Sequence, residues 1–332
     1  MIIREGSLNL EILKGFEKGP GARGDGFYNR EMQTSRDFTV SILKIIGRGN
    51  ALDSMAGTGI RGLRIALEAG WNVVVNDINK KNVEIIERNA NENNVNVEIW
   101  NKNFFSAVSE KKWDYIDIDP YGSPSGFIEA AIFNLKNNGI IGVTMTDTAN
   151  LEGKSLKKGF RIYGGISQRG IYSRELATRI FLGYILKRGA SLGYGGTPLL
   201  VIREKHYIRA FVRFKKGSGV SDKILEKIHE STVDEKKVGP LYMGELYNKE
   251  VISSIDKNGL STNSIKLLER FWNEDLMFLF FTNSRGTEEL NMDMIINKLR
   301  ENGFKAGRTN FYEKGIKTNA SQDEFENIIY NL

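Results

Sequence analysis

The sequence predicts an α/β protein whose core is a parallel, doubly wound β-sheet. Short apolar runs alternate with amphipathic segments from Asn50 to about residue 149. A glycine-rich turn follows the first of these runs, and several later runs end on an aspartate. Alternation of strand and helix at this spacing is typical of a parallel sheet with helices on both faces.

The predicted elements follow one another without a long gap. Strands are expected over residues 50–53, 71–77, 95–103, 111–122 and 140–149. Helices are expected over residues 35–47, 60–70, 79–94, 125–139 and 173–193. In the segment 79–94, for example, Val83, Ile86 and Ala90 fall on one helical face. The segment 152–170 is predicted to be a basic, glycine-rich loop, and the segment 198–217 to be two β-runs with a turn near Glu204.

A second, smaller domain is expected after the sheet. The composition changes at residues 215–223, and the remaining segments are more helical, with a basic strand-like stretch over 307–320. The sequence therefore predicts a catalytic α/β domain over 1–217 and a smaller α+β domain over 218–332.

The composition excludes several kinds of site and favours a polyanionic partner. The chain has 332 residues, no cysteine and two histidines, which excludes disulfides, thiol nucleophiles and cysteine-bound zinc. The net charge of +6 fits a nucleic-acid ligand, although a merely basic surface gives the same value. No apolar run of transmembrane length and no signal-peptide pattern is present, so a cytoplasmic protein without membrane, metal or obligate protein partner is expected.

The glycine turn predicts a nucleotide-type ligand. Gly57, Gly59 and Gly62 follow a strand with G-x-G-x-x-G spacing, and Asp77 ends the next strand, where an acid can hold ribose hydroxyls. This pattern alone fits either a dinucleotide or S-adenosylmethionine. Asp53 ends the first strand and would repel a pyrophosphate, but it would suit an ammonium group. The alternative for Asp53 is a purely local bond that caps the turn.

The stretch YIDIDPYGSP, residues 115–124, places a carboxylate, a rigid turn and a ring at a strand end. Ligands of open α/β sheets bind beyond the carboxyl ends of the strands, so Asp119 should lie in the same crevice as Gly57 and Asp77. The Tyr121 ring would stack on a flat base, and the Pro120 carbonyl offers a second acceptor. The structural alternative is a Pro-Tyr-Gly turn with a capping aspartate.

A carboxylate beside an aromatic amine has a chemical use. The lone pair of such an amine is delocalised into its ring and attacks a methyl group poorly. A carboxylate that accepts the N–H localises the lone pair and stabilises the positive charge that grows on nitrogen. General-base help of this kind contributes about 10²–10⁴-fold in rate. The pattern therefore favours methyl transfer to an exocyclic amine.

These residues resemble the D-P-F-G-S-P motif of the tRNA guanine-26 N2-dimethyltransferase family. Further segments resemble that family's motifs in the same order along nearly the whole chain: 26–37, 53–62, 161–165, 198–213, 239–246 and 308–320. The resemblance implies a Rossmann-like class I methyltransferase domain. It also implies transfer of methyl groups from S-adenosylmethionine to N2 of guanine 26 in tRNA, giving N2-methyl- and N2,N2-dimethylguanosine.

The resemblance also implies roles for individual residues. Arg36, Arg61 and Asp77 would hold S-adenosylmethionine, together with Asp53, Gly57 and Gly59 of the turn, and Asn103 and Phe104 would contact its adenine. Asp119 would be the catalytic carboxylate, and Phe27 and Tyr121 would stack the target guanine. Arg30, Tyr121 and Arg174 depart from the family pattern, which leaves the number of methyl transfers and the exact substrate position open. A role for Glu129 or Asp147 in catalysis is also open.

Two basic segments are candidates for tRNA binding. The first follows Asp147 and comprises Lys154, Lys157, Lys158, Arg161 and Arg169; the second comprises Lys305, Arg308, Lys314 and Lys317. Three other functions compete with the main one: methylation of a different guanine or adenine amine in tRNA or rRNA, nicotinamide-dependent redox chemistry, and RNA binding without catalysis. Asp53 and Asp119 argue against the last two.

Overall fold

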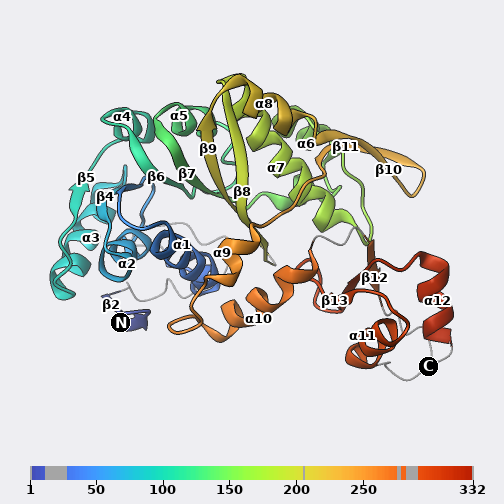
Figure 1. The fold of residues 1–332 in the computed structure, drawn as a ribbon. Coiled ribbons are helices and arrows are strands. Elements are labelled where there is room, and N and C mark those ends of the chain that lie inside the picture. Colours follow the sequence, from blue (N-terminus) through green and yellow to red (C-terminus); the bar gives the residue numbers. More distant parts are fainter. Residues whose placement is uncertain (1, 12–27, 205, 275–277, 282–290, 331–332) are drawn as a thin grey trace.

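A seven-stranded mixed sheet forms the centre of the molecule (Figure 1). The computed structural model describes residues 2–11, 28–204, 206–274, 278–281 and 291–330. In sheet order the strands are β5 (Glu98–Trp100), β4 (Asn72–Asn76), β3 (Asn50–Asp53), β6 (Trp113–Ile118), β7 (Leu135–Met145), β9 (Ile208–Lys216) and β8 (Tyr194–Arg203). The first five are parallel, whereas β9 is antiparallel to both of its neighbours, so β8 runs with the first five. The predicted fold class is confirmed.

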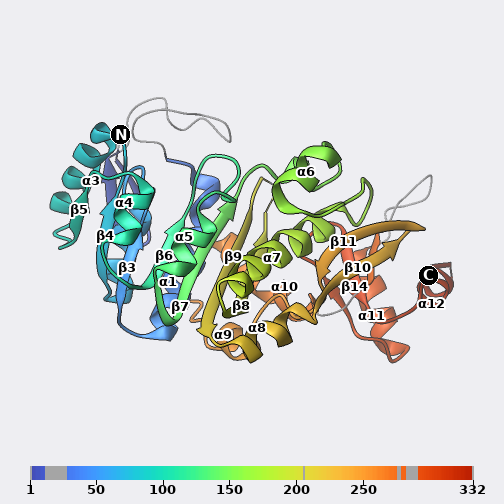
Figure 2. The ribbon, with the colours of Figure 1, turned by 90° about the horizontal axis from the view of Figure 1, so that it is seen from above.

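Helices cover both faces of the sheet (Figures 1 and 2). One face packs on α1 (Gln33–Ile46), α2 (Ile60–Ala69), α3 (Lys80–Glu92), α9 (Lys249–Ser253) and α10 (Thr262–Arg270). The other packs on α4 (Phe104–Ser109), α5 (Ile128–Phe133), α7 (Ser173–Ser191) and α8 (Ser218–Leu225). Successive strand residues alternate between the two cores, as Ala51 and Leu52 do, because side chains of a strand point to opposite faces.

Two predicted elements differ from the structure. The helix expected over 125–139 ends at Phe133, and β7 begins at Leu135. Gly139 does not end a helix but lies inside β7, where a Cβ atom would come within 2.9 Å of the Lys136 carbonyl oxygen. The loop expected over 152–170 contains a helix, α6 (Leu156–Tyr163), which ends at Gly164 with a left-handed φ of 64°.

An N-terminal hairpin was not expected from the sequence. Strands β1 (Ile2–Glu5) and β2 (Leu8–Glu11) pair antiparallel, and Leu8 and Leu10 are fully buried in a core shared with α2 and α3. The alternation of apolar and polar residues in LNLE was the available signal, but it is only four residues long.

The C-terminal third of the chain divides into two parts. Residues of α8, of the hairpin β10 (Ile228–Val233) and β11 (Lys236–Tyr242), and of α9 and α10 enter the two cores of the sheet. A separate core contains Ile295, Leu299 and Ile316. It belongs to α11 (Met292–Glu301), β13 (Ala306–Arg308), β14 (Gly315–Thr318) and α12 (Gln322–Tyr330), and β12 (Phe278–Phe281) pairs with β14. The boundary at Gly217 stays a prediction.

Short 3₁₀ helices complete the described elements: η1 (Arg30–Met32), η2 (Thr148–Asn150) and η3 (Phe271–Asn273). Within the described ranges, no helix combines the length and apolar character that crossing a membrane requires.

Candidate active site

Four aspartates follow the carboxyl ends of neighbouring parallel strands. Asp53 ends β3, Asp77 follows β4, Asp119 follows β6 and Asp147 follows β7. Since these strands are parallel, their carboxyl ends meet at one edge of the sheet. The structure therefore brings together the acids that the sequence placed in one crevice.

The glycine turn is fastened to Asp77. The backbone N–H of Gly57 donates to Oδ2 of Asp77 over 2.8 Å, and Oδ1 accepts the N–H of Asn79. Gly57 and Gly59 have φ values of 58° and 80°, which a residue with a Cβ adopts at a cost. The turn thus holds its shape through glycine conformations and one carboxylate, which can still accept hydroxyl groups on its remaining lone pairs.

Asp53 is shielded from solvent and bonded to the start of α2. It is 2% exposed, and its Oδ2 accepts the N–H of Gly62 over 2.8 Å in the first turn of α2. A Cβ on residue 62 would lie 2.7 Å from Cγ2 of Val75, so a glycine at this position lets α2 pack closely against β4 and Asp53. Burial, together with the nearby Asp117 carboxylate, raises the pKa of Asp53 to about 7, although the Arg61 guanidinium opposes this. The contacts of Asp53 favour a structural role, although the bond reaches Gly62, nine residues away, and is not the local turn-capping bond that the sequence suggested as the alternative.

Arg61 connects Asp119 to the interior of the sheet. Its guanidinium forms an ion pair with Asp119, and its Nε lies 3.3 Å from Oδ1 of the buried Asp117. Its Nη1 donates to the hydroxyls of Ser35 and Thr39 on α1, each over 3.1 Å. Burial lowers the pKa of Arg61, but the carboxylates of Asp117 and Asp119 outweigh this and raise it. The side chain of Asp119 remains 23% exposed, so a ligand can reach it.

Asp117 forms the centre of this network, and the sequence did not reveal its role. Its carboxylate is fully buried, forms an ion pair with Arg209 of β9, and accepts the hydroxyl of Tyr115. Burial raises the pKa of Asp117, but Arg209 and Arg61 lower it more, and the net direction is downward. An acid inside an apolar strand, two residues before Asp119, was the available signal.

The loop after β6 is joined to the loop after β7. Gly122, with φ 83°, donates its N–H to the Thr146 hydroxyl over 2.8 Å and accepts the Thr146 N–H over 3.1 Å. The Tyr121 ring is 57% exposed at this edge. Ser123 shares a 2.7 Å hydrogen bond with the Tyr163 hydroxyl, which donates to Oδ1 of Asp147. Asp147 is therefore held by Tyr163.

Three other predicted site residues, Asn103, Phe104 and Arg36, have structural contacts in the described part of the chain. Asn103 caps α4 by accepting the N–H of Ser106, and Phe104 is buried against Phe127. Arg36 forms a bidentate pair with Glu5, with both distances 2.6 Å, and so contacts the N-terminal hairpin. Phe27 lies outside the described residues.

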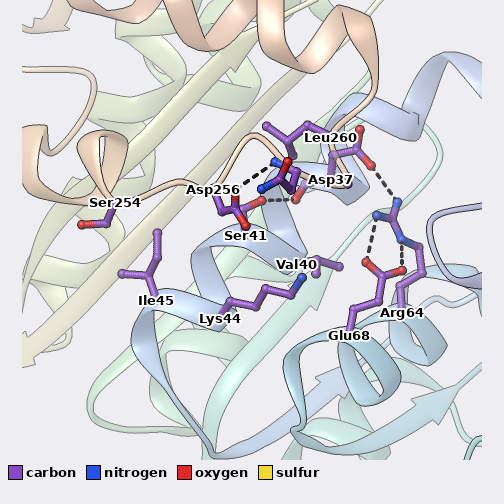
Figure 3. Close-up of a pocket in the computed structure, with 12 residues that line it drawn as sticks. Asp37, Val40, Ser41, Lys44, Ile45, Arg64, Glu68, Ser254, Asp256 and Leu260 are labelled. Atoms are coloured by element: carbon purple, nitrogen blue, oxygen red, sulfur yellow. Dashed lines mark hydrogen bonds and ion pairs between the residues drawn. The ribbon is translucent and has the colours of Figure 1, made fainter.

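A cavity of about 310 Å³ opens elsewhere, between α1, α2 and the segment 254–260 (Figure 3). It contains none of the predicted site residues. The charge of Arg64 in its wall is already balanced by Asp37 at 2.8 Å and Glu68 at 2.9 Å. In the described part of the chain, no group of three or more acids and histidines is arranged to hold a metal ion.

Comparison with known proteins points to one family. The family model described as N2,N2-dimethylguanosine tRNA methyltransferase matches residues 14–235 and 226–330. The tRNA (guanine(26)-N(2))-dimethyltransferase of Thermoplasma volcanium is 34% identical to this chain, with 99% of this chain and 98% of the relative covered. That of Thermoplasma acidophilum is 32% identical, with 99% and 97% covered.

A solved structure is similar over the same length. Trm1 from Pyrococcus horikoshii, in complex with S-adenosyl-L-methionine, superposes with a TM-score of 0.84 at 28% identity, and the match covers 99% of both chains. The similarity therefore includes the C-terminal part as well as the sheet.

Proposed function

Because this chain belongs to the N2,N2-dimethylguanosine tRNA methyltransferase family, we propose that it transfers methyl groups from S-adenosylmethionine to N2 of guanine 26 in tRNA. The observation that carries the proposal is 34% identity over almost the full length of a relative with that name. Asp119, exposed beside Arg61 at the carboxyl edge of the sheet, supplies the chemistry that this reaction needs.

The residues at this edge fit S-adenosylmethionine, which supplies an electrophilic methyl group when bound. The glycine turn approaches Asp77 closely, and the Thr58 hydroxyl within it is buried without a hydrogen-bond partner among the described residues. An unpaired buried hydroxyl is costly unless a ligand completes it. The proposal assigns the cofactor to Arg36, Gly57, Gly59, Arg61, Asp77, Asn103 and Phe104, and Asp53 acts indirectly by holding Gly62 at the start of α2.

The chain's own residues then act on the guanine. Phe27 and Tyr121 stack the base, which must leave its helical stack in tRNA at a cost of a few kcal/mol. Asp119 accepts an N–H of the exocyclic amine, and the Pro120 carbonyl accepts the other. The amine nitrogen takes the methyl group from bound S-adenosylmethionine, which leaves as the neutral thioether, and Asp119 takes up the proton that the amine loses. Arg61 holds the Asp119 carboxylate in place during this step.

The proposal also gives the two domains different roles. Residues 218–332 hold the tRNA, and the sheet domain carries out the chemistry. A cytoplasmic location follows from the same substrate.

Methylation of an unmodified tRNA transcript tests the proposal. The transcript is incubated with protein and S-adenosylmethionine, digested, and analysed by mass spectrometry for methylated guanosines. Methylguanosine at position 26 is expected from the wild type, and Asp119→Asn should lower kcat by about 10²–10⁴-fold because the amide accepts no proton. Asp222→Asn, an exposed acid on α8, is the matched control. Methylation at another nucleotide, or equal activity of both variants, contradicts the proposal.

A further inference from the structure

The surface around α6 combines free cations with exposed apolar side chains. From Gly153 to Arg174 the chain contains six lysines and arginines and no acidic residue. Phe160 is 56% exposed and Leu156 is 44% exposed, and they lie one helical turn apart. Lys157 and Arg161 form a parallel stripe beside them, and Lys158 is exposed next to it. We call Leu156, Lys157, Lys158, Phe160 and Arg161 the α6 surface.

The cations of the α6 surface have no recorded partner. Among the described residues, no ion pair or side-chain hydrogen bond engages Lys157, Lys158 or Arg161. By contrast, the exposed Arg188 on α7 pairs with Glu129 at 2.9 Å. A concentration of like charge without counter-ions destabilises a surface by self-repulsion, unless a polyanion covers it.

The buried face of α6 is fixed against the catalytic loops. Gly159 packs so closely on η2 that a Cβ would lie 2.6 Å from the Asn150 carbonyl oxygen. One turn later, the Tyr163 hydroxyl bridges Ser123 of the Asp119 loop and Asp147 after β7. Figure 2 shows α6 at the upper edge of the view, and no labelled helix or strand lies above it. The helix therefore presents its charges at a fixed position beside the catalytic loop.

We propose that the α6 surface is a docking site for the tRNA backbone next to the target guanine. The inference rests on the proposed function and adds to it a second tRNA contact, next to the reacting base, besides that of residues 218–332. Lys157, Lys158 and Arg161 bind phosphates, and Phe160 stacks on a base or ribose next to the displaced guanine. Phosphate contacts position a nucleic acid without reading its sequence, so this surface would add affinity and leave the choice of base to the catalytic loop.

Equilibrium binding of an unmodified tRNA transcript to the full chain tests the docking site, independently of catalysis. The double variant Lys157→Ala/Lys158→Ala should weaken binding at least about tenfold, because two phosphate contacts and the counterion release that accompanies them are lost. The slope of log K against log salt should fall by about one for each lost contact. Phe160→Ala should weaken binding about fivefold or more, because it removes one stacking partner.

A matched control lies on the opposite edge of the sheet. Lys215 and Lys216 are exposed at the end of the antiparallel strand β9, and Lys215→Ala/Lys216→Ala removes the same charge. The docking site is supported if the α6 variants lose affinity and salt slope while this control does not. Equal affinities and slopes in the two double variants overturn it. Methylation by the wild type is scored separately: absence of methylguanosine with an α6-dependent affinity refutes the proposed function and leaves the docking site standing.

Discussion

Replacing Glu5 with glutamine removes a carboxylate that two buried arginines share. Glu5 is 2% exposed, and its carboxylate accepts hydrogen bonds from Nε and Nη2 of Arg36, each over 2.6 Å. The Glu5 carboxylate also lies 3.0 Å from Nη1 of Arg64. Burial raises the pKa of Glu5, but Arg36 and Arg64 lower it more, to a net value of about 2. Each pKa unit corresponds to about 1.4 kcal/mol, so the drop from 4.5 gives about 3 kcal/mol of stability at neutral pH.

The pH dependence of this effect has a definite sign. A carboxyl whose pKa is lowered by folding contributes stability above its unfolded pKa of 4.5, and loses it as pH falls towards 2. Urea unfolding at several pH values should therefore show Glu5→Gln less stable than the wild type by about 3 kcal/mol at pH 7 and by about 1.5 kcal/mol at pH 3.

The control is Glu129→Gln, which makes the same change in a surface pair with 51% exposure. Exposed pairs contribute about 0–1 kcal/mol. If Glu5→Gln costs no more than this control, or if its cost is the same at pH 7 and pH 3, the reasoning about the Glu5 network is wrong.

Two further substitutions test the buried charges. Asp117→Asn leaves Arg209 and Arg61 without their shared carboxylate, and should lower the free energy of unfolding in urea by about 3–5 kcal/mol; a loss below about 1 kcal/mol would contradict the assigned network. Burial raises the pKa of Glu274 to about 7 despite Lys317 nearby, so the folded protein retains a proton that the unfolded chain releases from about pH 4.5. Stability of the wild type should consequently fall relative to Glu274→Gln between pH 5 and pH 8, and a pH-independent difference in urea midpoints would exclude this.

The parallel part of the fold was predictable because its signals are local. The strands β3, β4, β6 and β7 each contain an apolar run, and an acid or glycine turn marks the carboxyl end of each. The prediction that Gly139 ends a helix was wrong. In the sequence alone, a glycine that permits a close backbone contact within a strand cannot be distinguished from one that ends a helix. The prediction at α6 was also wrong, because glycines and lysines there suggested a loop.

The composition of the site was predictable, but its connections were not. The sequence predicts that Asp119, Asp77 and the glycine turn lie together, because each follows an apolar run that indicates a strand. The pairing of Arg61 cannot be predicted in this way, because its guanidinium extends from α2 to Asp119 after β6, 58 residues away. Arg209 is 92 residues from Asp117, and only the antiparallel placement of β9 in the sheet brings them together. No periodicity or motif encodes a pairing of this range.

The position of β9 between β7 and β8 affects how the chain folds while the ribosome synthesises it. Ile140 of β7 pairs with Arg213, so the outer edge of β7 has no strand to pair with until 73 more residues have been made. At a synthesis rate of about 5–20 residues per second, this interval is about 4–15 s. During it, the nascent chain carries an open, apolar strand edge that another chain can join. Translation speed through residues 146–216 therefore sets how long each new molecule is exposed to aggregation.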